Sequence, residues 1–272
     1  MPSNLLETQT EELFRDALAD VDGEAYLISP SAGVLEALIA LGARPDTDFP
    51  TVNVVADNRL LKDVMDDFLV AADAADLVAD GRLTLHELEE DVDNTLLVSD
   101  ESMYAIVTAT ETVGALAADE DDFLGDAYGT YSDLWERSPE FNLRTPPLSR
   151  IRETMDEQIG DAVRADFDTV LSSLETARGD GEGLDEVTIS LLVAAKNEAL
   201  LYDISKWGED VGIASKATFS RTKTRLEDVG IIDTEKVPID VGRPRLRLKF
   251  GDDRLKEASS EELAGVVQSI VE

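Results

Sequence analysis

Apolar residues in the first half of the chain alternate between short continuous runs and stripes with helical spacing. The runs predict strands, and the stripes, whose members recur every three or four positions, predict helices. Strands are predicted over 25–29, 51–56, 96–99 and 103–108, and helices over 5–19, 30–41, 60–78 and around Tyr128 to Trp135. This order favours an α/β domain with a mainly parallel sheet. Prolines at 139, 146 and 147 place its end at residue 147.

A longer amphipathic stripe follows between Leu148 and Arg178, and it predicts one long connecting helix. Its apolar positions are Ile151, Met155, Ile159, Val163, Phe167, Val170, Leu171 and Leu174. The stripe can pack on its own domain or form the interface of a two-fold dimer, and the sequence leaves both open. Glycines at 179, 181 and 183 predict a flexible hinge, so 148–183 is a connecting segment.

Residues 184–272 have the order of elements typical of a winged helix-turn-helix domain with a C-terminal helix. Helices are predicted over 187–201, 204–211, 215–229 and 260–271, and strands over 231–239 and 243–250. Asp203 and Ser215 are the expected caps of the second and third helices. Phe219, Thr222 and Leu226 share one face of the third helix and are expected to face the core.

The distribution of charge supports a DNA-binding function for this domain. The formal net charge of the 272 residues is −35, yet from Asp185 to Phe250 there are 11 basic and 11 acidic residues, against 11 and 42 up to Gly183. Cations beside phosphates supply most of the sequence-independent affinity for DNA. The predicted DNA-binding residues, on the third helix and the second strand of the wing, are Ser215, Lys216, Thr218, Ser220, Arg221, Lys223, Thr224, Arg225, Arg243, Arg245, Arg247 and Lys249.

Two further features of this set refine the prediction. Alternation places the four cations of the wing strand on one face, and Gly242-Arg243-Pro244 resembles tips that insert an arginine into a narrow A·T minor groove. An ordinary solvated surface is the alternative interpretation of these cations.

The acidic residues are spread along the chain, and Lys62 is the only lysine before residue 185. At molar salt the Debye length of ~3 Å removes the self-repulsion that such a charge produces. We therefore expect an acidic surface of a halophilic archaeon. No segment has the ~18 apolar residues of a membrane span and no signal peptide is recognisable, so a cytoplasmic location is expected.

Four stretches of the sequence carry a resemblance to a known family: SNLLETQ (3–9), LKDVMDDFLVAADAADLV (61–78), TATETVGALAAD (108–119) and SKATFSRTKTRLEDVGII (215–232). They resemble the haloarchaeal transcriptional regulators of the TbsP type, named for suppression of a defect in the sugar-responsive regulator TrmB. The resemblance implies a regulator of central carbon metabolism with an N-terminal sensing or assembly domain. Residues 125–138 are also loosely similar to effector domains of TrmB-like regulators. The expected partners are promoter DNA, a second copy of the chain and a small-molecule effector.

The alternatives are an enzyme or small-molecule binder in the first domain and a winged helix that binds protein. Zero cysteines and one histidine, His86 in a segment read as helix, exclude thiolate and paired-histidine sites within one chain. GxGxxG, GxxxxGK[ST] and GxSxG are absent from the sequence, so neither an enzyme nor a cofactor or metal is expected. A ligand pocket at the carboxyl ends of the strands would use Pro30, Ser31, Asp57, Asn58, Asp100 and Ser102, each of which could equally be a cap or turn residue.

Overall fold

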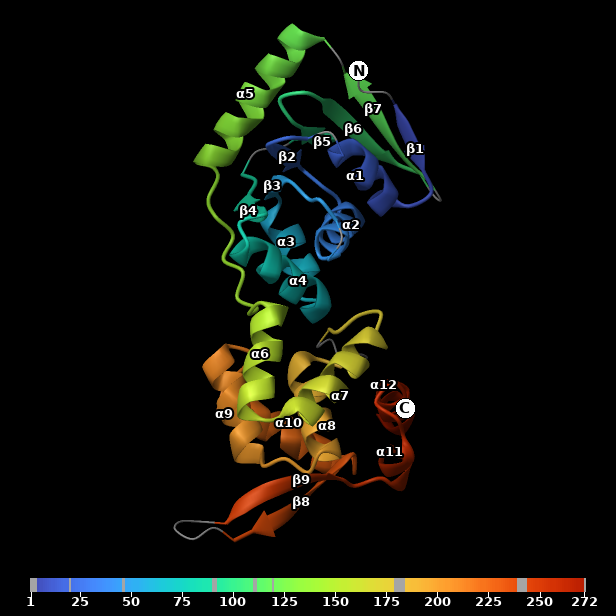
Figure 1. The fold of residues 1–272 in the computed structure, drawn as a ribbon, viewed down its shortest axis with the longest axis vertical. Helices are drawn as coiled ribbons and strands as arrows, with labels where there is room; N and C mark the ends of the chain where they lie inside the picture. Colours follow the sequence, from blue (N-terminus) through green and yellow to red (C-terminus); the bar gives the residue numbers. More distant parts are fainter. Residues whose placement is uncertain are drawn as a thin grey trace. The chain divides into compact units, whose positions relative to one another are not determined.

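The computed structural model of the chain describes residues 4–19, 21–45, 47–89, 92–109, 112–118, 120–178, 184–238 and 244–271. Contacts between Cα atoms divide it into two compact units (Figure 1). The first unit consists of Met1–Asp66 and Val70–Leu143, and the second of Asp67–Leu69 and Arg144–Glu272. In the described parts of the chain no helix is both long and apolar enough to cross a membrane.

The first unit is built on a seven-stranded sheet of mixed direction. The strands are β1 (Leu5–Glu7), β2 (Glu24–Ile28), β3 (Thr51–Ala56), β4 (Leu83–Glu87), β5 (Thr95–Val98), β6 (Met103–Thr108) and β7 (Val113–Ala118), in the order β1-β7-β6-β5-β2-β3-β4. Only β2, β3 and β4 pair in parallel, and the other four pairings are antiparallel. The α/β class is confirmed, but the prediction of a mainly parallel sheet is wrong. A parallel crossover needs about a dozen residues or more, and β5, β6 and β7 follow one another too closely for one.

The described residues of this unit include five helices, which cover the two faces of the sheet unequally. They are α1 (Thr10–Leu18), α2 (Ala32–Gly42), α3 (Asn58–Val64), α4 (Phe68–Ala79) and α5 (Asp121–Arg137). The first two residues of α4 belong to the second unit. The larger core includes residues of α1 and α2 and one side of β2, β3 and β7, whereas α5 packs against the other side of β2, β3 and β5. Two predicted helices differ from the structure: α1 begins only at Thr10 because Leu5–Glu7 pairs with β7, and the helix expected over 60–78 is divided between α3 and α4.

His86 lies on strand β4, which corrects the expectation of a helical histidine. Its ring stacks on Trp135 of α5 at 4.9 Å between centroids, and its Nδ1 lies 3.0 Å from the Trp135 carbonyl oxygen. Trp135 Nε1 donates a hydrogen bond to Thr84 Oγ1 at 2.9 Å. These contacts hold α5 on the sheet, so His86 has a structural role.

The second unit begins with two helices where one was expected. Its elements are α6 (Leu148–Gln158), α7 (Asp161–Ser172), α8 (Glu186–Lys196), α9 (Leu201–Val211), α10 (Lys216–Asp228), β8 (Ile232–Val237), β9 (Arg245–Phe250), α11 (Asp253–Glu257) and α12 (Leu263–Val271). Gly160, with φ of 137°, separates α6 from α7. A residue with a side chain rarely adopts this φ, so the predicted long connecting helix is wrong at this glycine.

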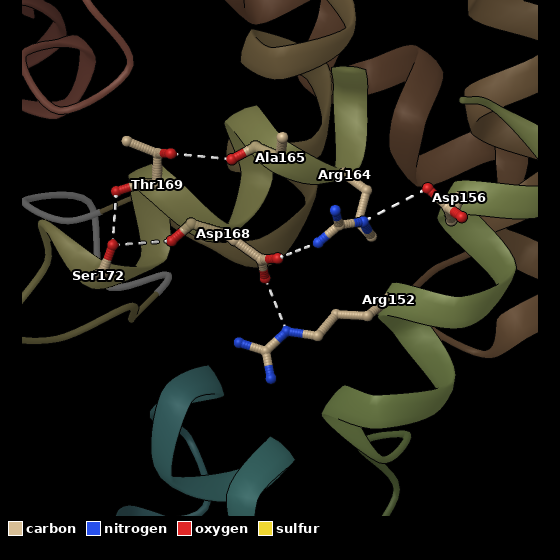
Figure 2. Close-up of polar contacts among 7 residues, drawn as sticks. All are labelled: Arg152, Asp156, Arg164, Ala165, Asp168, Thr169 and Ser172. Carbon is tan, nitrogen blue, oxygen red and sulfur yellow. Dashed lines mark hydrogen bonds and ion pairs between the residues drawn. The ribbon is translucent and has the colours of Figure 1, made fainter. Parts of the chain in front are cut away.

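The apolar stripe of α6 and α7 is buried within the second unit. Ile151, Met155, Val163 and Phe167 are at most 4% exposed, and α6 packs on α7 and α9 while α7 packs on α8. Figure 2 shows the polar side of the pair, where Asp168 accepts hydrogen bonds of 2.7 Å from both Arg152 and Arg164. The first of the two predicted roles, packing on its own domain, is therefore the observed one. These side chains are not available as a dimer interface.

Candidate nucleic-acid interface

Helices α9 and α10 form a helix-turn-helix whose turn is set by glycine and serine. Gly212 adopts the left-handed conformation with φ of 100°, and the N–H of Ile213 donates to the Gly208 carbonyl at 2.8 Å. Ser215 Oγ accepts a hydrogen bond from Thr218 N at 3.2 Å, which confirms Ser215 as the cap of α10. Asp203 is not the cap of α9, because that helix already begins at Leu201 and Asp203 instead binds Arg245.

The two helices cross where Gly208 meets the fully buried ring of Phe219. A Cβ atom built on Gly208 would lie 2.3 Å from Phe219 Cε2, far inside van der Waals contact. The absence of a side chain at residue 208 therefore sets the approach of α10 to α9, and with it the direction in which the exposed face of α10 points.

We expect Gly208→Ala to lower the free energy of unfolding of the second unit by about 1–3 kcal/mol, because the Phe219 ring must be displaced inside a packed core. The matched control is Gly265→Ala in α12, where no atom lies within 4 Å of the added Cβ. That variant should gain up to about 1 kcal/mol from helix propensity alone. Urea unfolding in molar KCl, followed by circular dichroism, compares the two. Equal midpoints would contradict the close approach of the helices.

The exposed face of α10 carries the side chains that could contact base edges. Phe219, Thr222 and Leu226 are buried as predicted, at 0%, 9% and 4% exposure. The opposite side presents a shallow depression lined by Ser220, Arg221, Thr224, Arg225, Asp228 and Val229. Arg221 donates to Thr218 Oγ1 at 3.3 Å, and it has no carboxylate within ion-pair distance in the described part of the chain.

The other cations of α10 are bound to carboxylates of the same unit. Lys216 Nζ lies 2.5 Å from Glu209 Oε2, Lys223 Nζ lies 2.6 Å from Glu227 Oε2, and Arg225 Nη2 lies 4.0 Å from Asp185 Oδ2. The hydrogen bond between Lys216 and Glu209 lowers the pKa of the Glu209 carboxyl and raises the pKa of the Lys216 ammonium. The Lys223 side chain is only 11% exposed, so it lies outside the exposed face.

The cations of the hairpin of β8 and β9 are also paired with carboxylates. Arg245 pairs with Asp203 at 3.0 Å, Arg247 with Glu198 at 3.9 Å and Lys249 with Glu235 at 2.5 Å. The Arg245 guanidinium also lies 4.0 Å from the centroid of the Tyr202 ring. Gly242 and Arg243, predicted at the tip, lie outside the described residues.

The hairpin is anchored to the rest of the unit through its second strand. Leu248 N donates to the Ala199 carbonyl at 2.9 Å, and Arg247 forms an isolated bridge with Leu200 just before α9. Leu248 and Phe250 are buried, so β9 presents its cations on the side away from the core, as alternation predicts.

The carboxylate partners of these cations are the residues that sequence reasoning missed. Lys223 and Glu227 stand four apart on one helix, a spacing that the sequence alone can reveal. Glu209 reaches Lys216 across the turn, and Asp203 reaches Arg245 from another element, 42 positions away. Only the fold brings these two pairs together.

The predicted ligand pocket does not assemble as one site. Because β5 runs antiparallel to β2, with Tyr26 opposite Val98 and Ile28 opposite Leu96, the turn holding Asp100 and Ser102 lies at the opposite end of β2 from Pro30 and Ser31. Asp57 caps α3 by accepting from Arg59 N and Leu60 N, with Asn58 as the first residue of that helix. Ser102 binds Ser99 at 3.0 Å. Among the described residues, no group of three His, Asp or Glu side chains could hold a metal ion.

Comparisons with known proteins cover both units. A family model described as "Transcriptional regulator TbsP-like, N-terminal" matches residues 2–146, and one described as "Transcriptional regulator TbsP-like, C-terminal HTH domain" matches residues 147–268. No curated protein matches the chain.

Several solved structures show distant similarity, and two of them each match 52% of this chain with a TM-score of 0.36. The archaeal chromatin protein TrmBL2 is 14% identical, and the match spans about half of it, 54% of its chain. Nuc from Salmonella typhimurium, a phospholipase D family member, is 12% identical, with 99% of its chain covered.

Proposed function

This chain belongs to the family of TbsP-like transcriptional regulators, and from that premise we propose that it reads duplex DNA with the exposed face of α10. The observation that carries the proposal is the row of exposed residues Ser220, Arg221 and Thr224 on that face. Arginine can bind guanine through two hydrogen bonds in the major groove. Among the described residues Arg221 forms no ion pair with a carboxylate that DNA binding would have to break, so it is the first candidate for base readout.

In this proposal the hairpin acts as a wing. Arg245, Arg247 and Lys249 approach backbone phosphates beside the groove that receives α10, and Arg243, which the sequence predicts at the tip, would enter the minor groove. Phosphate contacts position a protein on DNA, whereas base contacts specify the sequence. Ser215 and Thr218, at the start of α10, would bind phosphate together with the helix N-terminus.

The proposal extends to the target promoters, the oligomeric state and the source of the protein. We propose that the chain binds promoters of genes of central carbon metabolism as a homodimer. A two-fold dimer would select a pseudo-palindromic DNA site with half-sites about 34 Å apart. The first unit, with no catalytic role, would sense a small metabolite or assemble the dimer. The net charge of −35 supports a halophilic source, in which salt screens the acidic surface.

Arg221→Ala tests base readout. We expect it to weaken the binding of the preferred duplex by about 1–3 kcal/mol and to relax the base preference at one position of the site. The site is first selected from a random duplex library with the intact protein in molar KCl, and affinities are then measured by fluorescence anisotropy.

Lys223→Ala is the matched control for this test. Its side chain is a cation of the same helix that is largely covered, so its loss should leave the base preference unchanged. If the intact protein selects no preferred DNA sequence, the proposed function is overturned. If Arg221→Ala keeps the affinity and base preference of the wild type, the role assigned to Arg221 is overturned.

A further inference from the structure

One half of a sheet face in the first unit is apolar and uncovered. Helix α5 packs on this face over β2, β3 and β5. Beyond β5, on the side that ends at the edge strand β1 (Figure 1), Leu6 is 74% exposed, Val107 55% and Leu116 57%. Large exposed apolar side chains are ordinary when they are scattered, but a contiguous group marks an interaction site.

The strand register places these three side chains together. Leu6 lies opposite Gly114, which lies opposite Val107, and Leu116 lies opposite Ala105 in the next row. Ala118 and Met103 form the row after that. The alternate residues Leu5, Tyr104, Ile106, Val113 and Ala115 face the larger core on the other side. The open face, defined as Leu6, Val107, Gly114, Leu116 and Ala118, therefore carries no charge. Met103 and Ala105 beside it are partly buried against the cluster that α5 covers.

A layer that covers three strands must span roughly 14 Å, at about 4.8 Å per strand. A partner molecule with an apolar surface of this width could cover the open face.

Charge narrows the identity of that molecule. Only five basic residues precede residue 137, so an anionic surface of lipid or nucleic acid has few cations to bind near the open face. A second copy brings the same uncharged face, and two such faces can meet without burying an unpaired charge, which is costly. Two sheets can also stack face to face at a separation of about 10 Å.

We propose that the open face is the dimer interface, with the sheets of two copies stacked across a two-fold axis. This deepens the proposed function, since it names the surface of the homodimer proposed there. Strands β6 and β7 have six residues each, about 20 Å, and β1 has three, about 10 Å, so the footprint is on the order of 200 Å². This area is well below the ~800 Å² per partner of a standard interface. The dimer is therefore reversible and dissociates on dilution.

The test is the oligomeric state of the full chain in molar KCl, measured by sedimentation velocity over a dilution series. Wild-type protein should shift from dimer to monomer on dilution. Leu116→Asp should remain monomeric at concentrations where wild type is a dimer. Val78→Asp is the matched control, because Val78 is an exposed aliphatic residue of the same unit, 39% exposed at the end of α4, and is not part of the open face. It should behave as wild type.

A second measurement uses the absence of cysteine from the sequence. Leu116→Cys should form a covalent dimer under mild oxidation, and Val78→Cys should not. A wild-type protein that stays monomeric at every concentration, or a Leu116→Asp variant that dimerises as wild type does, would overturn the proposal.

DNA binding is scored separately in the same variants. Monomeric Leu116→Asp should still bind a half-site with the base preference of wild type. A dimer that forms through the open face but selects no DNA sequence would contradict the proposed function and leave the interface standing.

Discussion

Replacing Trp207 by alanine is expected to lower the free energy of unfolding of the second unit by about 3–5 kcal/mol, the usual effect of removing a large buried side chain. Trp207 of α9 is 1% exposed, and its Nε1 donates to Thr154 Oγ1 of α6 at 3.0 Å. Thr154 keeps a hydrogen bond to the Arg150 carbonyl at 2.8 Å, so the loss comes chiefly from the cavity left behind. The measurement is denaturant unfolding in molar KCl, followed by far-ultraviolet circular dichroism.

Two variants control this experiment. Trp207→Phe fills most of the volume and removes the hydrogen bond, so a loss near 1 kcal/mol is expected. Tyr202→Ala removes an aromatic side chain from the same helix that is 46% exposed, and its effect should be within about 1 kcal/mol. If Trp207→Ala destabilised the protein no more than Tyr202→Ala does, the packing of α6 on α9 would be refuted.

The second large effect concerns salt. Each neutralised phosphate contributes about −0.9 to the slope of log affinity against log salt, so the eight predicted cations would give a slope near −7. Lys216, Lys223, Arg225, Arg245, Arg247 and Lys249 are six of these eight, and each has a carboxylate oxygen within 4.0 Å. A cation that moves to a phosphate leaves a carboxylate that takes up a salt cation. The uptake of salt cations by the carboxylates offsets the release of counterions from the phosphates.

We therefore expect a slope of about −2 or shallower, set by the remaining two cations. A fourfold rise in KCl would then weaken binding about 16-fold, against about 16,000-fold for a slope of −7. The measurement is fluorescence anisotropy with the selected duplex over a KCl series in which circular dichroism confirms folding.

Glu209→Gln isolates the cause, because it frees Lys216 and should steepen the slope by about 1. Glu257→Gln in α11 changes the net charge equally but removes no partner of a predicted DNA-binding cation, so its slope should match wild type. A wild-type slope near −7 would show that the carboxylates play no part.

The second unit could be predicted well from the sequence because its determinants are local. The cap at Ser215 and the spacing of Phe219, Thr222 and Leu226 both act within one or two turns of α10. Alternation likewise placed the cations of β9. Gly160 was the exception, since an unbroken apolar stripe does not reveal a positive φ.

The first unit was harder to predict from the sequence, because the strands that were not predicted depend on pairing with distant segments. Val113–Ala118 is rich in alanine and glycine, which have low β propensity, yet it forms β7 between two neighbours. The alternation of Leu83 and Leu85 in β4 was hidden by the acidic residues that follow it. The candidate pocket failed for a related reason: the direction of β5 decides which end of the sheet holds Asp100, and local sequence does not give that direction.

The pairing of β1 with β7 has a consequence for how the chain is made. Ala117 N donates to Asn4 Oδ1, and these residues lie 113 positions apart. During synthesis at about 5–20 residues per second, the first strand must wait several seconds before its partner exists. The hairpins of β5, β6 and β7 can form while the first strand is still unpaired, and the closure of so long a loop comes late. We expect the newly made segment Leu5–Glu7 to be accessible to proteases until then, whereas the finished protein holds it in the sheet.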